Sequence, residues 1–306
     1  MKGPGPIDKL CIIFDQRAEN DDRLNQGIQK IRDIGFMLSE KRIESPPDAA
    51  RFAAEAVRQK FDLVLAVGGD GMLNLVVNGM LKDKSGSECA VGLVPFGTGN
   101  DFARASGIPL ENALDAVAMA IDSTPVLIDV GQVNDTYFVN VVTGGFPAMA
   151  AAETSGSAKE LLGGFAYFLT GLTKIGSLVA HPGRFTGPGF EWKGKMYACA
   201  LGNGRRAGGG FSVSPRAVIT DGLLDLMIMP ESDKGLLSLV SDYYHMSRSE
   251  NPGDIQYAQL PWLDLSTREP IHLTAESPPE VGQRTAACYR PHRRQAVSPY
   301  SEKNDG

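Results

Sequence analysis

Two glycine-rich segments, each directly after an apolar run, constrain this chain more than any other feature. Residues 66–71 read AVGGDG at the end of FDLVLAV, and residues 95–101 read PFGTGND after AVGLV. A turn needs one glycine or two, whereas such clusters let the main chain approach a ligand closely. Ligands of open parallel sheets bind beyond the carboxyl ends of the strands, so both segments are predicted to face one crevice.

The order of the predicted elements separates the chain into two halves. Apolar runs and helical spacing alternate as far as residue 121, which predicts a parallel sheet covered on both faces, that is, an α/β fold. After about residue 128 short strands dominate, and the second half is predicted to be mainly β. The predicted strands are residues 10–14, 61–67, 90–96, 126–130, 137–142, 196–201, 218–219 and 223–229.

Charge and composition exclude several classes of protein. The net charge of −6 argues against nucleic acid as the main ligand, because phosphate backbones bind cationic surfaces. The four cysteines show no CxxC spacing, which favours reduced thiols over a zinc site or a disulfide framework. The N-terminus has no apolar signal region and no window has the apolar length of a membrane span, so a cytoplasmic protein is expected.

The first glycine segment suits the phosphates of a nucleotide. Gly68, Gly69 and Gly71 permit close approach, and free N–H groups at the start of the following helix attract phosphate. Asp70 would repel a bare triphosphate, so its presence indicates a magnesium nucleotide. The segment does not follow the GxxxxGK[ST] pattern of a Walker P-loop.

The second glycine segment adds polar side chains beside the first. Thr98 can donate its hydroxyl to phosphate, while Asn100 and Asp101 can cap the next helix or hold the first loop. Taken singly, each segment is better explained as a tight turn or a helix cap than as a binding site. The occurrence of both after neighbouring strands favours a shared binding site.

Taken together, these segments and their surroundings resemble the diacylglycerol kinase catalytic domain family. VGGDGMLNLVVNGML followed by VPFGTGNDFARASGIP carries the resemblance in the first half. IDVGQVN, YFVNVVTGGF, ALGNGRRAGGG and SPRAVITDGLLDLMIM extend it, to the YegS-like branch of bacterial lipid kinases. The similarity runs from about Leu10 to about Leu273.

The resemblance implies a Rossmann-like nucleotide-binding domain and a C-terminal β-sandwich. The domains are expected at residues 1–128 and 129–283, with the tail 284–306 as a candidate addition to the first. The implied reaction transfers the γ-phosphoryl group of ATP to a hydroxyl of a glycerol-based membrane lipid, similar to phosphatidylglycerol or diacylglycerol, during transient peripheral contact with the membrane. The implied ATP contacts are Gly68, Gly69, Asp70, Gly71, Met72, Leu73, Asn74, Leu75 and Thr98.

Two departures from the family pattern keep other functions open. The family usually has threonine at the position of Met72 and glutamate at the position of Leu75. This chain therefore lacks one hydroxyl and one carboxylate beside the phosphates. A catalytically impaired relative that binds nucleotide or lipid as a regulator is therefore the alternative hypothesis. A soluble-substrate kinase of the NAD kinase type is disfavoured by the segments GTGNDFAR and GNGRRAGGG.

The segment VITDGLLD has two compatible interpretations. Asp221 and Gly222 between apolar runs are typical of a hairpin turn. The resemblance implies that Asp221 binds Mg²⁺, with Ca²⁺ as a substitute, together with the carbonyls of Val218 and Leu223.

The catalytic residues implied by the resemblance are Asp70 and a general base. The family carries the base in a DGE motif, and this chain has IHLTAESP at residues 271–278 instead. Glu276 is the predicted base and Glu280 its nearby substitute. A changed reading frame near Ala275 and divergence of the lineage both explain the altered text. Arg205 and Arg206 are of a type that is usually solvated, although guanidinium groups also suit phosphates and lipid headgroups.

Overall fold

The protein folds into two compact units, which we describe separately from a computed structural model. Unit 1 comprises Met1–Asp129 and Arg290–Gly306, and unit 2 comprises Val130–Tyr289. Within them the structure describes residues 7–82, 88–144, 180–234, 236–248, 251–267, 273–275, 284–289 and 296–297.

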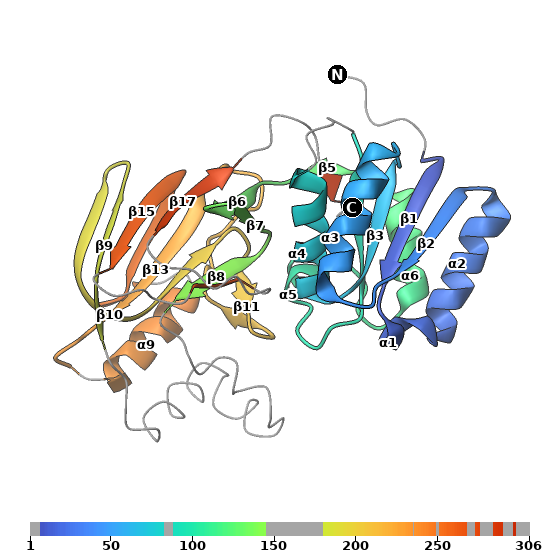
Figure 1. The fold of residues 1–306 in the computed structure, drawn as a ribbon. Coiled ribbons are helices and arrows are strands. Elements are labelled where there is room, and N and C mark those ends of the chain that lie inside the picture. The colour runs from blue at the N-terminus through green and yellow to red at the C-terminus, as the bar shows by residue number, and fades with distance from the viewer. Residues whose placement is uncertain are drawn as a thin grey trace, which may run out of the picture. The chain divides into compact units, whose positions relative to one another are not determined.

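Unit 1 is built on a six-stranded sheet of order β2-β1-β3-β4-β18-β5 (Figure 1). Its neighbouring strands pair in parallel, except for β18 and β5. All residues of β3 and β4 are buried, as expected for central parallel strands with helices on both faces. The strands are β1 (Lys9–Phe14), β2 (Met37–Arg42), β3 (Leu63–Gly68), β4 (Ala90–Pro95), β5 (Val126–Leu127) and β18 (Ala296–Val297).

Helices cover both faces of this sheet. Helix α3 packs on α4, and α2 packs on α6, so each pair forms one layer (Figure 1). Helix α2 begins where Asp21 accepts the N–H of Leu24 and ends at Gly35, whose φ of 95° suits glycine. The helices of unit 1 are α1 (Gln16–Glu19), α2 (Asp22–Ile34), α3 (Pro46–Arg58), α4 (Asp70–Lys82), α5 (Asp101–Ala105) and α6 (Ala113–Asp122).

Unit 2 is built on a ten-stranded antiparallel sheet with the path β14-β13-β10-β9-β15-β17-β6-β7. Strand β8 leaves this path and pairs with β10 and β16. The strands are β6 (Val130–Val133), β7 (Thr136–Phe138), β8 (Val141–Gly144), β9 (His181–Gly187), β10 (Phe190–Gly202), β13 (Leu224–Pro230), β14 (Gln256–Leu260), β15 (Trp262–Thr267), β16 (Leu273–Ala275) and β17 (Arg284–Tyr289). A small hairpin, β11 (Arg206–Ala207) and β12 (Phe211–Ser212), stands apart from this sheet.

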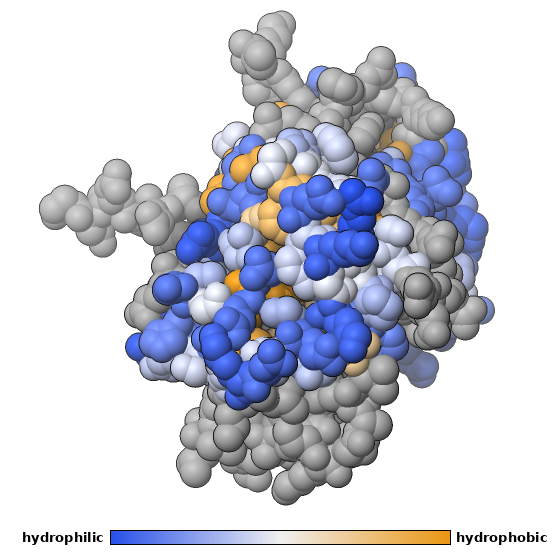
Figure 2. All heavy atoms as spheres, turned by 90° about the vertical axis from the view of Figure 1, so that its left-hand side faces the viewer, coloured by the Kyte–Doolittle hydropathy of each residue, from blue (hydrophilic) through white to orange (hydrophobic). Residues whose placement is uncertain are grey.

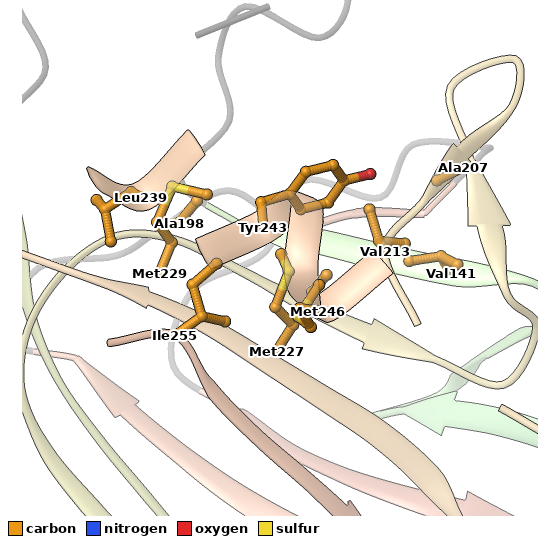
Figure 3. Close-up of a cluster of buried hydrophobic side chains, with 11 residues drawn as sticks. Val141, Ala198, Ala207, Val213, Met227, Met229, Leu239, Tyr243, Met246 and Ile255 are labelled. Carbon is orange, nitrogen blue, oxygen red and sulfur yellow. The ribbon is translucent and has the colours of Figure 1, made fainter. Parts of the chain in front are cut away.

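The centre of the unit 2 sheet is buried on both faces. Met227 and Met229 of β13 join one hydrophobic cluster, whereas Leu226 and Ile228 join another, because side chains alternate across a strand. Helix α9 (Leu236–Ser247) covers the first of these clusters with Leu239, Tyr243 and Met246 (Figure 3). Figure 2 shows the side of unit 2 at the left of Figure 1, where hydrophobic residues surface only as a narrow strip among hydrophilic ones.

These features confirm the predicted fold class, a parallel α/β half followed by an antiparallel β half. The predicted strand at residues 218–219 is wrong, because the carbonyl of Val218 accepts the N–H groups of Thr220 and Asp221 and closes a turn instead. No helix among the described residues is long and apolar enough to cross a membrane.

The packing of α3 on α4 depends on a glycine. A Cβ atom built on Gly79 of α4 would lie 2.1 Å from the carbonyl oxygen of Ala50 in α3. Gly27 of α2 is the matched case, because its Cβ would meet only side-chain atoms of Val117, at 3.3 Å or more. The first contact requires the backbones to move apart, and the second does not.

We predict that Gly79→Ala destabilises the protein although alanine favours helix. Overpacking of a core costs about 1–3 kcal/mol, against a gain in helix propensity of about 1 kcal/mol. Gly27→Ala should not destabilise the protein, because the same gain in helix propensity offsets the close contact with the Val117 side chain. Urea unfolding of both variants measures the difference, and equal stability of the two would contradict the close contact between α3 and α4.

Candidate active site

The two glycine segments lie side by side at the carboxyl ends of β3 and β4. These strands pair in parallel with Gly68 opposite Pro95, so the loops that follow them start at the same edge of the sheet. The N–H of Phe96 donates to the carbonyl of Gly68 at 2.9 Å and extends the pairing by one bond. The register of two buried strands therefore brings the predicted loops together.

The main chains of the two loops touch through a pair of glycines. A Cβ atom on Gly97 would lie 2.5 Å from the Cα of Gly69, and one on Gly69 would lie 2.9 Å from the Cα of Gly97. Both distances are shorter than any ordinary contact and both involve backbone atoms. Glycine is thus needed at both positions for the loops to meet, and Gly97 was not among the residues predicted from the sequence.

Asn100 fixes the shape of the second loop. Its Oδ1 accepts the N–H of Gly97 at 2.9 Å, and its Nδ2 donates to the carbonyl of the same residue at 2.7 Å. Its backbone has a φ of 49°, a left-handed conformation that asparagine tolerates better than most residues. Because its side chain is used in this way, Asn100 makes no cap bond to helix α5, which it precedes.

Asp70 supplies the missing cap from the first loop. One of its carboxylate oxygens accepts the N–H of Asp101 at 2.9 Å, and the other accepts the N–H of Phe102 at 2.8 Å. These are the first two residues of α5, whose N–H groups have no partner within the helix. The carboxylate predicted to meet a magnesium nucleotide therefore joins the two loops, and the geometry gives Asp70 a positioning role.

The remaining predicted nucleotide residues occupy the first turns of α4 and the tip of the second loop. Thr98 is exposed, while Met72 and Leu73 are buried and Leu75 is half-buried. Asn74 is 3% exposed, and its Oδ1 has no hydrogen-bond partner among the described residues. An unsatisfied buried acceptor calls for a donor such as water or a ligand hydroxyl.

The three predicted metal ligands lie in one turn of unit 2. The Oδ1 of Asp221 accepts the N–H of Leu223 at 2.9 Å, and Gly222 has a φ of 77°, as a tight turn requires. The donor set is one carboxylate and two main-chain carbonyls, all oxygen, which suits Mg²⁺ or Ca²⁺. The carbonyl of Val218 already accepts two N–H groups, whereas the side chain of Asp221 is exposed. Among the described residues no three His, Cys, Asp or Glu side chains cluster as a metal site.

A buried carboxyl group follows this turn. Asp225 of β13 is fully buried, and burial raises the pKa of its carboxyl to about 6. The hydroxyl of Tyr257 donates to Asp225 Oδ1, and Gln259 Nε2 donates to Oδ2 at 3.4 Å. The sequence analysis did not single out Asp225, Tyr257 or Gln259. The one signal in the sequence was an aspartate within the apolar strand β13. The predicted base Glu276 and its substitute Glu280 lie outside the described residues.

Comparison with protein families defines the class to which this fold and these loops belong. Residues 9–133 match the family described as the diacylglycerol kinase catalytic domain. Residues 140–250 match the family described as the YegS C-terminal NAD kinase beta sandwich-like domain. A solved diacylglycerol kinase from Bacillus anthracis shares the fold, with a TM-score of 0.77 at 22% identity over 96% of this chain and 97% of that one.

Closer relatives specify the branch. A protein of Pseudomonas aeruginosa (strain UCBPP-PA14) named "Probable lipid kinase YegS-like" is 35% identical over 279 residues, which is 90% of each chain. A protein of the same name from Yersinia enterocolitica is 34% identical over 90% of this chain and 91% of that one. The chain belongs to the YegS-like lipid kinases, a family of ATP-dependent phosphotransferases, as the sequence motifs predicted.

We predict that Asp70→Asn loosens the joint between the loops. Asparagine offers one acceptor oxygen, and its amide group would face an N–H of α5, so the variant should lose about 1–3 kcal/mol of unfolding free energy. Asp22→Asn is the matched control, because Asp22 is also the first residue of a helix but is exposed. Urea unfolding compares the two. A variant at Asp70 as stable as the control would show that its carboxylate does not hold the loops.

Proposed function

We propose that this protein transfers the γ-phosphoryl group of ATP to a hydroxyl of a glycerol-based membrane lipid, similar to phosphatidylglycerol or diacylglycerol. The observation that carries the proposal is the contact between Gly69 and Gly97 in a chain of the YegS-like lipid kinase family. The contact brings the two glycine loops together beside the N-terminus of α4, and the N-terminus of a helix favours phosphate.

The nucleotide phosphates are proposed to lie along the first turn of α4. Gly69 and Gly71 leave room for the phosphates, the exposed hydroxyl of Thr98 donates to them, and Asn74 offers an acceptor to a ligand hydroxyl. Met72 packs beside Gly68, where an added Cβ would lie 2.5 Å from the Cβ of Met72. The methionine thus fills space at the loop, and the ATP contact at this position is through the main chain.

Phosphoryl transfer to an alcohol needs positioning, charge neutralisation and an acceptor for the hydroxyl proton. Glu276 is proposed as the proton acceptor, and Asp70 as the residue that keeps the two phosphate loops in register. Mg²⁺ bound with ATP would neutralise charge on the phosphates. A second cation, Mg²⁺ or Ca²⁺, is proposed at Val218, Asp221 and Leu223, where it would tie the turn of unit 2.

The site of action is proposed to be the cytoplasmic face of the membrane, reached by transient peripheral contact. Tyr244 and Trp262 of unit 2 are 50% and 45% exposed, and aromatic side chains of this kind favour the interface between lipid and water. The regulator hypothesis remains the second candidate, because Met72 and Leu75 replace the polar residues usual in the family.

Lipid phosphorylation separates these functions. Purified protein is incubated with radiolabelled ATP and a total extract of membrane lipids, and the labelled products are resolved. Label in a phospholipid or diacylglycerol product supports the proposal. ATP binding with no labelled lipid would favour the regulator, and label only in water-soluble acceptors would favour a kinase of the NAD kinase type.

We predict that Glu276→Gln abolishes transfer without loss of nucleotide binding. Glutamine keeps the size and reach of the side chain but cannot accept the proton, so lipid phosphorylation should fall about 10²–10⁴-fold. Glu280→Gln is the control and should change little. Titration of ATP and the lipid assay on the same preparations measure both effects. Loss of activity at Glu280 with activity retained at Glu276 would move the base to Glu280.

We predict that magnesium raises the melting temperature of the protein through Asp221. A ligand that binds only the folded state stabilises it, so the melting temperature of the unmodified protein should rise with Mg²⁺ and fall with a chelator. Asp221→Ala should remove this dependence, whereas Asp233→Ala, an exposed aspartate of unit 2, should keep it. A melting temperature of the unmodified protein that ignores both additions would eliminate the site.

A further inference from the structure

Unit 2 carries a group of arginines on the segment 203–217, which the proposed reaction does not use. The hairpin of β11 and β12 reverses through Gly208, Gly209 and Gly210, all with positive φ. Arg205 precedes the hairpin and Arg216 follows it, and both side chains are exposed. The chain reverses direction at this hairpin, so Arg205 and Arg216 lie on opposite sides of it in sequence.

Arg205 is anchored against the arm that carries Arg216. Its Nε donates to the carbonyl of Ala217 at 2.8 Å, and its own carbonyl accepts the N–H of Ser214 at 3.2 Å. The guanidinium group of Arg205 is thereby held beside the residue next to Arg216. The Nε bond leaves the terminal Nη1 and Nη2 groups for a ligand, and these form a fork that matches phosphate oxygens.

The main chain of Arg216 is held by Tyr257 and Gln259, which also contact the buried carboxylate of Asp225. Tyr257 accepts the N–H of Arg216 at 3.2 Å and donates its hydroxyl to Asp225. Gln259 Nε2 lies 3.4 Å from both the carbonyl of Arg216 and Asp225 Oδ2. The guanidinium of Arg216 lies over the ring of Tyr257, with its Cζ 5.2 Å from the centroid. A closed set of hydrogen bonds thus fixes the main chain of Arg216.

Within the part of the chain that the structure describes, neither guanidinium forms a salt bridge. Among the described residues, Arg51 pairs with Asp48 and Glu55, and Arg184 pairs with Glu191, but no carboxylate pairs with Arg205, Arg206 or Arg216. Asp225 attracts Arg216 electrostatically, yet its two oxygens are occupied by Tyr257 and Gln259. Two anchored positive charges therefore remain on one loop of a chain whose net charge is −6.

We propose that Arg205 and Arg216 form a binding site for a phosphate ester. The ligand chemistry is a tetrahedral oxyanion that accepts hydrogen bonds from two guanidinium groups, and its source is either the headgroup of an anionic phospholipid or a soluble phosphate. Arg206 offers an internal control. It is exposed, and because side chains alternate along a strand it points away from Ala207, which is buried in the core.

Direct binding without ATP tests the site independently of catalysis. The probes are inorganic phosphate, soluble glycerophosphoglycerol, and phosphatidylcholine vesicles with and without phosphatidylglycerol. The proteins are the full chain and its variants Arg205→Lys, Arg205→Ala, Arg216→Ala and Arg206→Ala, each checked for an unchanged urea midpoint. Each lost hydrogen bond to a charged group should weaken binding at least about tenfold.

The expected result is that Arg205→Ala and Arg216→Ala weaken binding of the phosphate ester about tenfold or more, while Arg206→Ala leaves it within about twofold. Arg205→Lys should fall between, since lysine keeps the charge but not the fork. Loss confined to the phosphatidylglycerol vesicles and glycerophosphoglycerol identifies a lipid headgroup, and loss that includes inorganic phosphate identifies a soluble phosphate. Equal weakening by Arg206→Ala, or no binding of any probe that depends on Arg205 and Arg216, would overturn the proposal.

Discussion

The contact between two main chains at Gly69 and Gly97 is the constraint on which the candidate site depends. A Cβ on either residue would lie within 3.0 Å of a Cα atom of the other, so neither position accepts a larger residue without movement of a loop. This contact is possible only because β3 and β4 pair in parallel and end at the same level. The phosphate loops are thus a consequence of strand register, with glycine providing the space.

The carboxylate of Asp70 stabilises the same contact. It accepts the N–H groups of two α5 residues that lie 31 and 32 positions further along the chain. Asn100 cannot cap this helix, because its side chain holds Gly97. Asp70, the first residue of α4, therefore caps the N-terminus of α5. An aspartate is compatible with a phosphate site here because both carboxylate oxygens accept backbone N–H groups at the start of α5, which stabilise its negative charge.

The parts of the fold that could be predicted from the sequence are those in which a local residue pattern determines the local structure. The apolar runs of β3 and β4 and the glycines after them were sufficient to predict the strands and the loops. The edge strand β2 was missed because its residues, MLSEKR, are mostly polar and none is buried. The strand at residues 218–219 was wrong because apolar residues there sit in a turn. The partner of Asp70 could not be predicted, since it depends on the register of β3 and β4 and on a side-chain bond made by Asn100.

The two glycine loops are proposed to act together as one nucleotide site. Hydrogen exchange of backbone amides, with and without Mg·ATP, is the measurement that distinguishes a joint site from two separate loops, because exchange reports protection residue by residue. If the loops form one site, ATP should slow exchange in residues 69–75 and in residues 96–102 over the same range of ATP concentration. Protection of only one loop, or protection elsewhere in the chain with both loops unchanged, would contradict it.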